Sequence, residues 1–569
     1  MNDVLKRFFT LLSPDKMDIL FIQIYGIAGG LINLTLPLGV QAIIGLVMAG
    51  AISSSWVLLV VLVTVGVFVT GGLQMMQIIL TEMIQQRLFV RSAMAFASRI
   101  PKFKIEALSK YYPPELINRF FDTFTIQKGI PKVTIDITTA IFQIFFGIIL
   151  LSFYHPFFIF FGVGNLVILY LIFHFSWNSG LRTSIQESTH KYELAHWLEE
   201  IARTMETFKL SGNVSLPIKI TDILTNNYIK VRKKHFRVIL FLFVNSVIFR
   251  TILTGGLLLI GGILVIDMEL SIGQFVAAEI VIILIGQSIE KLVRALETIF
   301  DVLTATHKIG YVMDIPVERT TGVDFETVDS GKGMAVSIKD LTFNYPNSTK
   351  DTLSGINLDL QPGERVCLAG FNASGKTTLI NLVSGLFQDF GGNITYNGVP
   401  LRNLNIESVR ENIGDVLTQE MIFPGTIEQN ITMDRPNVNF VHVKEVADRL
   451  GLDEYVRNLP LGYNTYIKPE GSELPRSMAR LIIIARAVVH RPQLLVVEEI
   501  MHNLQRNIKE NISSFLTDED QPWSMLVVSN DPIMAAKCDR VVVLRNGEII
   551  ADDVHANLTD KEFYPEIFI

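Results

Sequence analysis

The chain has 569 residues, of which 49% are hydrophobic and only 18% are charged, with 49 Lys+Arg against 56 Asp+Glu and a formal net charge of -7. This composition is too apolar for an ordinary soluble protein, and the length exceeds that of one domain. Without a basic stripe, nucleic-acid binding has no electrostatic support. The two cysteines, Cys367 and Cys538, lack metal-ligand spacing, so the sequence predicts neither a disulfide nor a zinc site.

The apolar residues are concentrated in the first half of the chain. Residues 19–81 contain no Asp, Glu, Lys or Arg, a stretch far longer than the roughly 20 residues that cross a bilayer as a helix. The stretch must fold back, and the small polar segment Ala49–Ser55 predicts where, with a kink at Pro37 before it. In total six spans are predicted, at Asp18–Met48 and Trp56–Leu80, in the two halves of Ile137–Leu181 on either side of Ser152–Pro156, and at Val238–Ile266 and Ile272–Ile289.

Basic residues follow the second and fourth spans and are missing from the other three turns. They are Arg87, Arg91, Arg99, Lys102 and Lys104, and then Arg232, Lys233, Lys234 and Arg237. Because basic loops stay in the cytoplasm, both termini are predicted there, in a multi-pass protein of the cell (inner) membrane. The N-terminal stretch places Phe8, Phe9, Leu11 and Leu12 beside Lys6 and Arg7, which predicts an amphipathic helix on the membrane surface rather than a cleaved signal.

The composition changes near residue 320. Two loops of about 50 residues, Glu82–Lys132 and Arg182–Arg237, have helix-permissive, mixed-charge sequence and predict cytoplasmic helical hairpins. The last span should continue to about Met313. Pro316–Gly333 is rich in Thr, Gly and Asp and predicts a linker. The predicted domains are therefore 1–315, a membrane domain, 316–333, a linker, and 334–569, a domain of different composition.

A phosphate-binding motif opens this last domain. The run Arg365–Ala369 predicts a strand, GFNASGKT at Gly370–Thr377 matches G-x-x-x-x-G-K-[ST], and Thr378–Leu386 predicts a helix. Glycine lets backbone N–H groups close around phosphates, Lys376 neutralises their charge, and Thr377 offers a hydroxyl to Mg²⁺. The alternative, a chance glycine-rich turn, does not require the flanking strand and helix.

Other strand-like runs supply candidate acids. Gln493–Val497 ends in Glu498 and Glu499, where a phosphate-loop ATPase places a metal-holding carboxylate and a water-activating one. Taken alone, these residues would predict a strand capped by solvated acids. Ser524–Val528 precedes Asn530, and Arg540–Leu544 followed by Arg545–Gly547 predicts a hairpin.

With six spans before this domain, the chain resembles an ATP-binding cassette (ABC) half-transporter of the exporter type from about Asp18 to Gly547. The resemblance implies an all-α six-helix transmembrane domain followed by a cytoplasmic α/β nucleotide-binding domain, working as a homodimer or with a second half-transporter, with ATP and Mg²⁺ as cofactors. It implies Glu499 as general base, and Thr377, Gln419 and Glu498 at Mg²⁺. The implied ATP-binding residues are Tyr345, Gly370, Asn372, Ala373, Ser374, Gly375, Lys376, Thr377, Thr378 and Gln419.

For Tyr345 a packed strand aromatic is the open alternative to stacking on adenine. The resemblance also implies coupling helices near Pro114–Phe124 and Arg203–Leu210, resting on the nucleotide-binding domains.

Several motifs depart from the family pattern. The signature aligns with Leu474 followed by Pro475, Arg476, Ser477 and Met478, so a ring and a long cation stand where the family has a serine and a glycine. Glu498 replaces an aspartate, Asn530 replaces the switch histidine, and the D-loop is altered at His502–Gln505. The expectation is that ATP binds and that hydrolysis is slow, in a homodimer or a heterodimer alike.

The predicted function is ATP-dependent export, of the type I secretion or peptide-export branch, with a periplasmic adaptor as a candidate partner. A lipid flippase and an ATP-binding regulatory subunit without turnover are the alternatives, and the sequence does not specify cargo. Within the spans, Arg250, Glu279 and Asn245 are polar. Intramembrane charges indicate functional sites. Arg250 could instead pair with Glu279 or a backbone carbonyl as structural support, or lie near the cytoplasmic edge.

Overall fold

The structure is a computed structural model that describes the chain apart from residues 1, 49–53, 110, 213–214, 326–332, 347, 418–420, 502–503 and 569. The chain divides into two units, one formed by Met1–Pro101 and Tyr111–Ile315 and the other by Lys102–Lys110 and Pro316–Ile569. Each unit is described by itself. Most of the predicted first turn, at Ala49–Ser55, lies outside the described residues.

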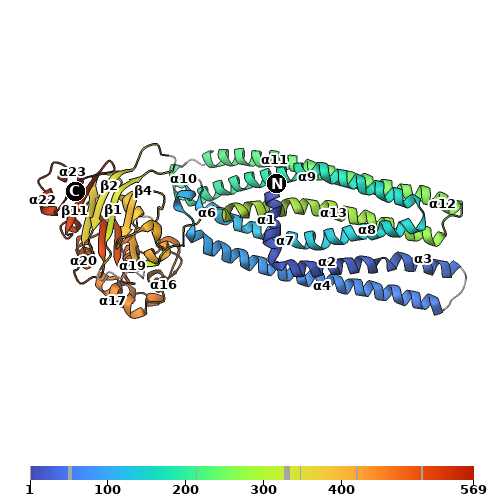
Figure 1. Ribbon diagram of the computed structural model, residues 1–569, viewed down its shortest axis with the longest axis horizontal. Helices are drawn as coiled ribbons and strands as arrows, with labels where there is room; N and C mark the ends of the chain where they lie inside the picture. Colours follow the sequence, from blue (N-terminus) through green and yellow to red (C-terminus); the bar gives the residue numbers. More distant parts are fainter. Residues whose placement is uncertain are drawn as a thin grey trace. The chain divides into compact units, whose positions relative to one another are not determined.

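Six helical segments of the described chain are long and apolar enough to cross a membrane, which confirms the six predicted spans. Figure 1 shows them running nearly parallel. In chain order the helices of this unit are α1 (Asn2–Leu12), α2 (Lys16–Asn33), α3 (Thr35–Met48), α4 (Ser54–Arg99), α6 (Pro113–Asn118), α7 (Asp122–Pro131), α8 (Ile137–Tyr154), α9 (Phe157–Arg203), α10 (Met205–Ser211), α11 (Ser215–Gly256), α12 (Gly262–Ile266) and α13 (Ile272–Met313). Two π-helical turns, Lys132–Asp136 and Leu257–Gly261, join α7 to α8 and α11 to α12.

The interruption between α2 and α3 shows how the sequence shapes a span. The helix breaks at Leu34, three residues before Pro37. Proline cannot donate to the carbonyl four residues earlier, and its ring crowds that carbonyl. The predicted kink at Pro37 is therefore realised one turn upstream of the proline itself.

The N-terminal helix α1 is amphipathic, as the sequence predicted. Val4, Phe8 and Leu12 are buried, at helical spacing, whereas Phe9 is exposed on another face. Arg7 forms an ion pair with Asp314, the residue directly after α13, with 2.5 Å between Nη2 and Oδ2. The helix is thus fixed to the bundle by an apolar stripe and one ion pair.

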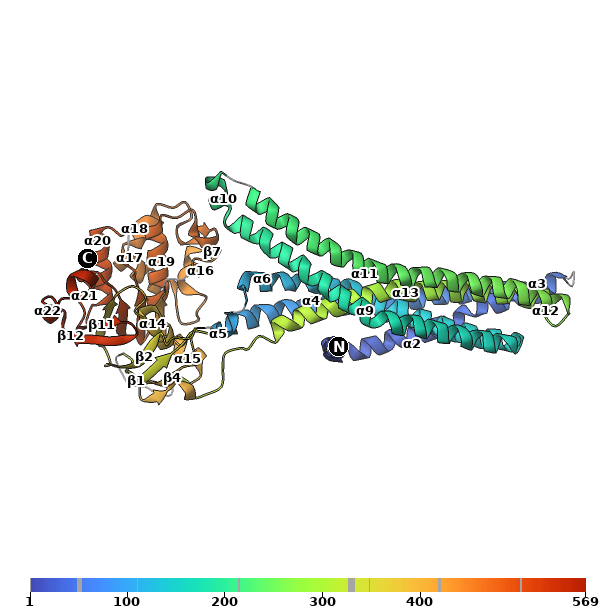
Figure 2. The same ribbon diagram turned by 90° about the horizontal axis from the view of Figure 1, so that it is seen from above.

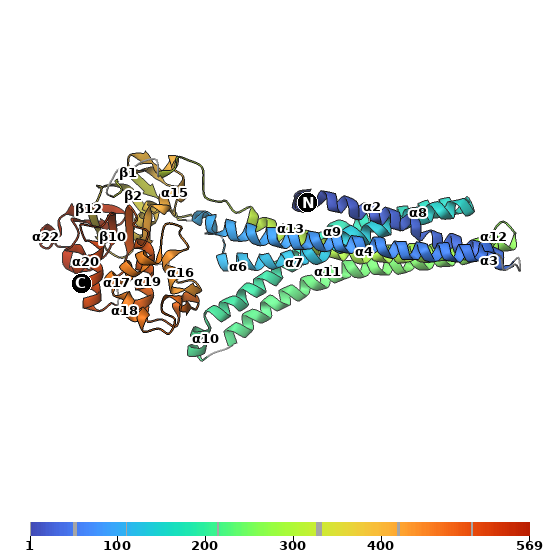
Figure 3. The ribbon, with the colours of Figure 1, turned by 90° about the horizontal axis from the view of Figure 1, so that it is seen from below.

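Helix α13 is the centre of the bundle. It packs against α3, α7, α8, α9 and α11, and one face of it is buried along almost its whole length. Helices α9 and α11 form a long hairpin that is tipped by α10, and Figures 2 and 3 show this hairpin diverging from the other helices toward α10. Helix α10 lies where the second coupling helix was predicted, at Arg203–Leu210, and Leu210 is 88% exposed.

The second unit is built on three sheets in its described part. A six-stranded sheet has the order β12 (Glu548–Asp553), β11 (Arg540–Arg545), β3 (Arg365–Gly370), β10 (Ser524–Val528), β9 (Leu494–Glu498) and β6 (Ile413–Val416), parallel except for β12. An antiparallel sheet has the order β2 (Leu353–Leu360), β1 (Val336–Phe343), β4 (Gly391–Tyr396) and β5 (Val399–Pro400), and β7 (Gly425–Thr426) pairs with β8 (Tyr466–Ile467). The four strands predicted from the sequence are all present, as β3, β9, β10 and β11.

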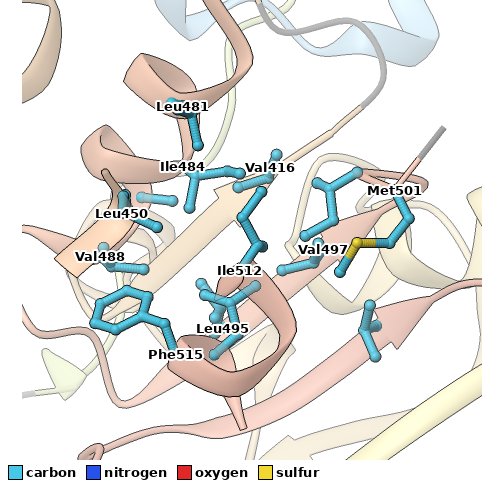
Figure 4. Packing of buried hydrophobic residues seen from close by; sticks show 14 of the residues in the cluster. Val416, Leu450, Leu481, Ile484, Val488, Leu495, Val497, Met501, Ile512 and Phe515 are labelled. Atoms are coloured by element: carbon cyan, nitrogen blue, oxygen red, sulfur yellow. The ribbon is translucent and has the colours of Figure 1, made fainter. Parts of the chain in front are cut away.

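Helices cover the larger sheet and enclose its core. They are α14 (Lys376–Val383), α15 (Ile406–Glu411), α16 (Ile427–Thr432), α17 (Phe440–Leu450), α18 (Leu452–Arg457), α19 (Arg476–Val488), α20 (Arg506–Leu516), α21 (Pro532–Ala535), α22 (His555–Leu558) and α23 (Tyr564–Ile567). In Figure 4, Ile484 of α19 and Ile512 of α20 converge on Leu495 and Val497 of β9. This continuous burial holds the strand ends that carry the candidate site.

The long loop predicted at Glu82–Lys132 is divided between the two units. Its segment Lys102–Lys110, which includes α5 (Ile105–Leu108), belongs to the second unit, whereas the predicted coupling helix Pro114–Phe124 belongs to the first. Glu106 accepts hydrogen bonds from the backbone N–H groups of Gln388, at 2.6 Å, and Asp389, at 3.3 Å. Glu106 therefore holds this segment to the rest of the second unit, and the coupling role of Pro114–Phe124 stays a prediction.

Replacing Glu106 with Ala should release this segment. The change removes a charged acceptor from two backbone amides, each such bond being worth about 1.5 kcal/mol. Hydrogen exchange at Gln388 and Asp389 should then be roughly tenfold faster. Ser109→Ala, in the same segment, is the control, and equal protection in the two variants would contradict the assigned contact.

Candidate functional site

The phosphate loop follows β3 and turns into α14. Gly370 has a φ of +150°, and a Cβ there would stand 2.2 Å from the carbonyl oxygen of Leu544. Gly375 has a φ of +102°, and its Cβ would stand 2.6 Å from Leu353 Cδ2. Both positions therefore require glycine. The helix begins at Lys376 and ends at Val383, so it starts and ends earlier than the predicted Thr378–Leu386.

Lys376 holds the loop closed. Its Nζ donates to the carbonyl oxygens of Gly370, at 2.7 Å, and Phe371, at 2.8 Å. Burial lowers the pKa of this ammonium, and the nearby carboxylates of Glu499 and Glu498 oppose that shift. The result is a partly desolvated cation at the start of a helix, which suits a phosphate.

The fit to a phosphate is supported by Ser374. Its side chain is 3% exposed, and its hydroxyl has no hydrogen-bond partner among the described residues. A buried hydroxyl without a partner carries a desolvation cost that an incoming oxyanion would remove. Ala373, with a φ of 60°, and the neighbouring Asn372 complete the bend of the loop.

Two carboxylates stand at the end of β9, as the sequence predicted, and they differ in exposure. Glu498 is buried and accepts a hydrogen bond from the hydroxyl of Thr377. Glu499 is exposed, has a φ of 45°, and donates its backbone N–H to Val528 at 3.0 Å. The parallel register of β9 and β10 thus fixes one acid inward at the loop and turns the other outward.

Asn530 fastens the loop to the next strand. Its Oδ1 accepts from the backbone N–H of Gly370 at 3.2 Å, and its Nδ2 donates to the carbonyl of Gly370 at 3.1 Å. The family resemblance describes this position only as one where a histidine is expected. The structure shows that its amide makes two bonds to the loop backbone, a pairing that a single imidazole cannot reproduce.

Tyr345 lies near the start of α14. Its hydroxyl is 3.0 Å from Thr378 Oγ1, and its ring packs edge-on against Phe343 and Phe387. Tyr345 and Thr378, two of the predicted ATP-binding residues, are therefore in contact. The ring contacts with Phe343 and Phe387 also fit the alternative of a packed strand aromatic. Gln419 lies outside the described residues, as do His502 and Asn503 of the altered D-loop.

The residues predicted to form an altered signature lie at the start of α19. Pro475 precedes the helix, Arg476 is its first residue, and both are exposed. Ser477 and Met478 are partly buried, and Met478 packs against the core of the second unit. Arg480, one turn on, donates to the Ile500 carbonyl at 3.1 Å and lies in the electrostatic field of Glu499. The sequence carries no signal for this contact of Arg480, because the signature motif ends at Met478.

Two family models match the chain. The ABC transporter transmembrane region matches residues 19–288, and the ABC transporter domain matches residues 353–502. The chain therefore belongs to the ATP-binding cassette (ABC) transporters and has the half-transporter arrangement, with one transmembrane region and one ATP-binding domain. With six spans it is a multi-pass membrane protein.

Solved and curated relatives agree with this assignment. The fold is similar to that of a bacterial Atm1-family ABC exporter with ATP bound, with a TM-score of 0.84 and 17% identity over 98% of this chain and 97% of the other. The ATP-dependent lipid A-core flippase of Saccharophagus degradans is 29% identical over 49% of this chain and 45% of its own. The alpha-hemolysin translocation protein HlyB of Escherichia coli O157:H7 is 28% identical over 53% and 42%. The chain thus matches about half the length of these curated relatives.

Replacing Lys376 with Ala should weaken ATP binding by roughly ten- to a hundredfold, the loss expected for one charge-assisted contact worth about 1.5–3 kcal/mol. Nucleotide titration of the purified full chain checks this. Lys339→Ala, at an exposed lysine of β1, is the control. Equal affinities of the Lys376 variant and the parent would contradict the assignment of the loop.

Proposed function

We propose that the chain is one half of a dimeric transporter that exports cargo across the cell membrane with energy from ATP, and that its hydrolysis is slow. The observation that carries the proposal is the closed phosphate loop, with Lys376 on its carbonyls and Glu498 on Thr377, on a chain that also has six apolar spans. ATP would supply the phosphates that join two such domains, and its cleavage would let them separate.

The residues around the loop have assigned roles in this proposal. Lys376 and the hydroxyl of Ser374 bind phosphate oxygens, and Glu499 orients water. Thr377 and Glu498 hold Mg²⁺, together with Gln419. Among the described residues no group of three or more His, Cys, Asp or Glu side chains could hold a metal by itself. Mg²⁺ would therefore depend on nucleotide oxygens for part of its coordination.

Slow turnover follows from the exposed start of α19. In the family, this helix start meets the nucleotide of the other subunit, and a bare glycine backbone allows close approach. Pro475 offers no backbone N–H, and Arg476 adds a long side chain at the next position. Either a homodimer or a heterodimer would keep at least one such site.

The alternatives differ in cargo or in turnover. A lipid flippase would share this architecture. The named relatives include both a lipid A-core flippase and a hemolysin translocation protein, so they favour neither lipid nor protein cargo. A periplasmic adaptor would accompany the secretion role. The two hydrogen bonds between the Asn530 side chain and the backbone of Gly370 favour another candidate, an ATP-sensing subunit without turnover. They brace the phosphate loop where a switch residue would have to move.

Restoring the signature tests whether ATP turnover is impaired by the residues at the start of α19. Pro475→Ser, Arg476→Gly and Ser477→Gly together should raise the steady-state ATPase rate by about tenfold or more, since one transition-state donor is worth at least that much. Met478 is left unchanged because it packs against the core. Asn530→His is added in a second variant, because it also removes the brace on Gly370.

Glu499→Gln provides the blank for these rates. A parent that already turns over at about 10 per second, with a slower repaired variant, would contradict the impaired-site proposal. Arg476 would then be the residue that donates hydrogen bonds to the phosphate, as the guanidinium geometry allows.

The proposed topology puts both termini in the cytoplasm and Met268 outside. Met268 is 92% exposed in the turn after α12, so Met268→Cys should react with an impermeant thiol reagent only from outside. Leu210→Cys, on α10, should react only from the cytoplasmic side. Reaction of the two with sides exchanged would reverse the topology. Ser53, a further candidate site, lies outside the described residues.

A further inference from the structure

The fifth span contains an arginine toward its inner end. Arg250 is the one charged residue between Val238 and Ile266, and 16 positions separate it from the end of α12. At 1.5 Å per residue it is about 24 Å from that end of the span. Its side chain is 56% exposed. Because the hydrocarbon core of a bilayer is about 30 Å thick, this distance puts Arg250 near the inner end of the span, where a guanidinium must reach water, lipid headgroups or protein.

Arg250 is part of a three-residue cluster between α11 and α13. Its Nη1 lies 3.3 Å from Oε2 of Glu290, and Nη2 of Arg294 lies 2.5 Å from the other oxygen, Oε1. Two guanidinium groups therefore share one carboxylate, which leaves a net charge of +1. The structure thus pairs Arg250 with Glu290 rather than with Glu279, the partner considered from the sequence.

The position of the cluster is built into the packing. A Cβ at Gly286 would stand 3.1 Å from Cγ of Arg250, so the absence of a side chain there makes room for the arginine stem on α13. The side chain of Arg294 is 72% exposed and that of Glu290 is 28% exposed. The cluster is therefore packed against α13 at Gly286, and its guanidinium groups are exposed on the surface of the described bundle.

The exposed face of α13 around the cluster is polar. Gln287, Lys291 and Arg294 are exposed at helical spacing, while Leu292, Val293 and Leu296 are buried on the other face. Lys291 adds a second excess positive charge. On α11 the residues two positions to either side of Arg250, Ile248 and Ile252, are exposed and apolar. Helix α11 thus has one face suited to lipid and another that is not.

We propose that Arg250, Glu290 and Arg294 form an oxyanion-binding site at the inner end of the export path, and that the cargo carries a phosphate or carboxylate group. Glu290 holds the two guanidinium groups at a fixed separation, and their remaining N–H donors face the path. Arginine pairs bind oxyanions in this way because each fork offers parallel donors. The proposal rests on the proposed export function and specifies the class of cargo.

The test is thiol modification at Gln287, one turn from the cluster, in membrane vesicles that contain the full chain. The native cysteines Cys367 and Cys538 are buried and give a low background. Gln287→Cys should react with both anionic sulfonatoethyl and cationic trimethylammonioethyl methanethiosulfonate, and faster with the anionic reagent. Ile252→Cys, at similar depth on the apolar face of α11, is the control and should react with neither.

Charge removal then identifies the source of the preference. Adding Arg294→Gln to Gln287→Cys should lower the anionic-to-cationic rate ratio by roughly tenfold, as expected for one charge acting over about 10 Å at an effective dielectric constant of about 40. Glu290→Gln should raise the ratio. Nucleotide binding, measured on the same samples, should be unchanged and reports folding.

Competition distinguishes the two oxyanions. Hexadecyl phosphate or hexadecanoate should protect Gln287→Cys from modification, and hexadecyltrimethylammonium should not. Protection by one of the anionic compounds alone assigns the headgroup. An unreactive Gln287→Cys, an equal rate for both reagents, or protection by neither anion would overturn the site, and none of these results would bear on ATP binding or on hydrolysis.

Discussion

The cost of an unpaired polar group in hydrocarbon governs the first unit. Backbone groups there must be satisfied inside each segment, which explains six long helices joined by short turns. Hydroxyl side chains within the spans follow the same constraint: Thr70 donates to the carbonyl of Gly66 at 2.9 Å, and Ser152 donates to that of Ile148 at 2.7 Å. Charged side chains that break this pattern need a special environment, and the shared carboxylate of Glu290 provides one for Arg250.

The second unit solves a different problem, which is to bring together residues that are far apart in the sequence. Parallel strands end at one edge, so the loop after β3, the acids after β9 and Asn530 after β10 meet there. The bond between Thr377 and Glu498 and the pair of bonds between Asn530 and Gly370 tie these three strand ends to one another. The Glu498 side chain reaches Thr377 directly in this arrangement and accepts the hydrogen bond of its hydroxyl.

The departures from the family pattern fall into two kinds once their surroundings are known. Asn530 and Glu498 make structural contacts with the loop, and each has a clear local effect. Pro475 and Arg476 are exposed at the start of α19, where their effect would depend on a second subunit. Slow hydrolysis is thus an expectation about the assembled dimer, whereas the bracing of the loop is a property of the single chain.

The sequence by itself determined the number of spans, the position of the phosphate loop and the strands around it, because hydrophobic runs and glycine spacing are local signals. Gly370, Lys376 and Glu498 could be assigned in this way. Only the tertiary structure decided that Lys102–Lys110 docks through Glu106, that Arg480 lies near Glu499, and that Arg250 pairs with Glu290 rather than Glu279. Each of these contacts joins residues whose separation along the chain carries no periodic signal, and it is set by which helix faces and strand ends pack together.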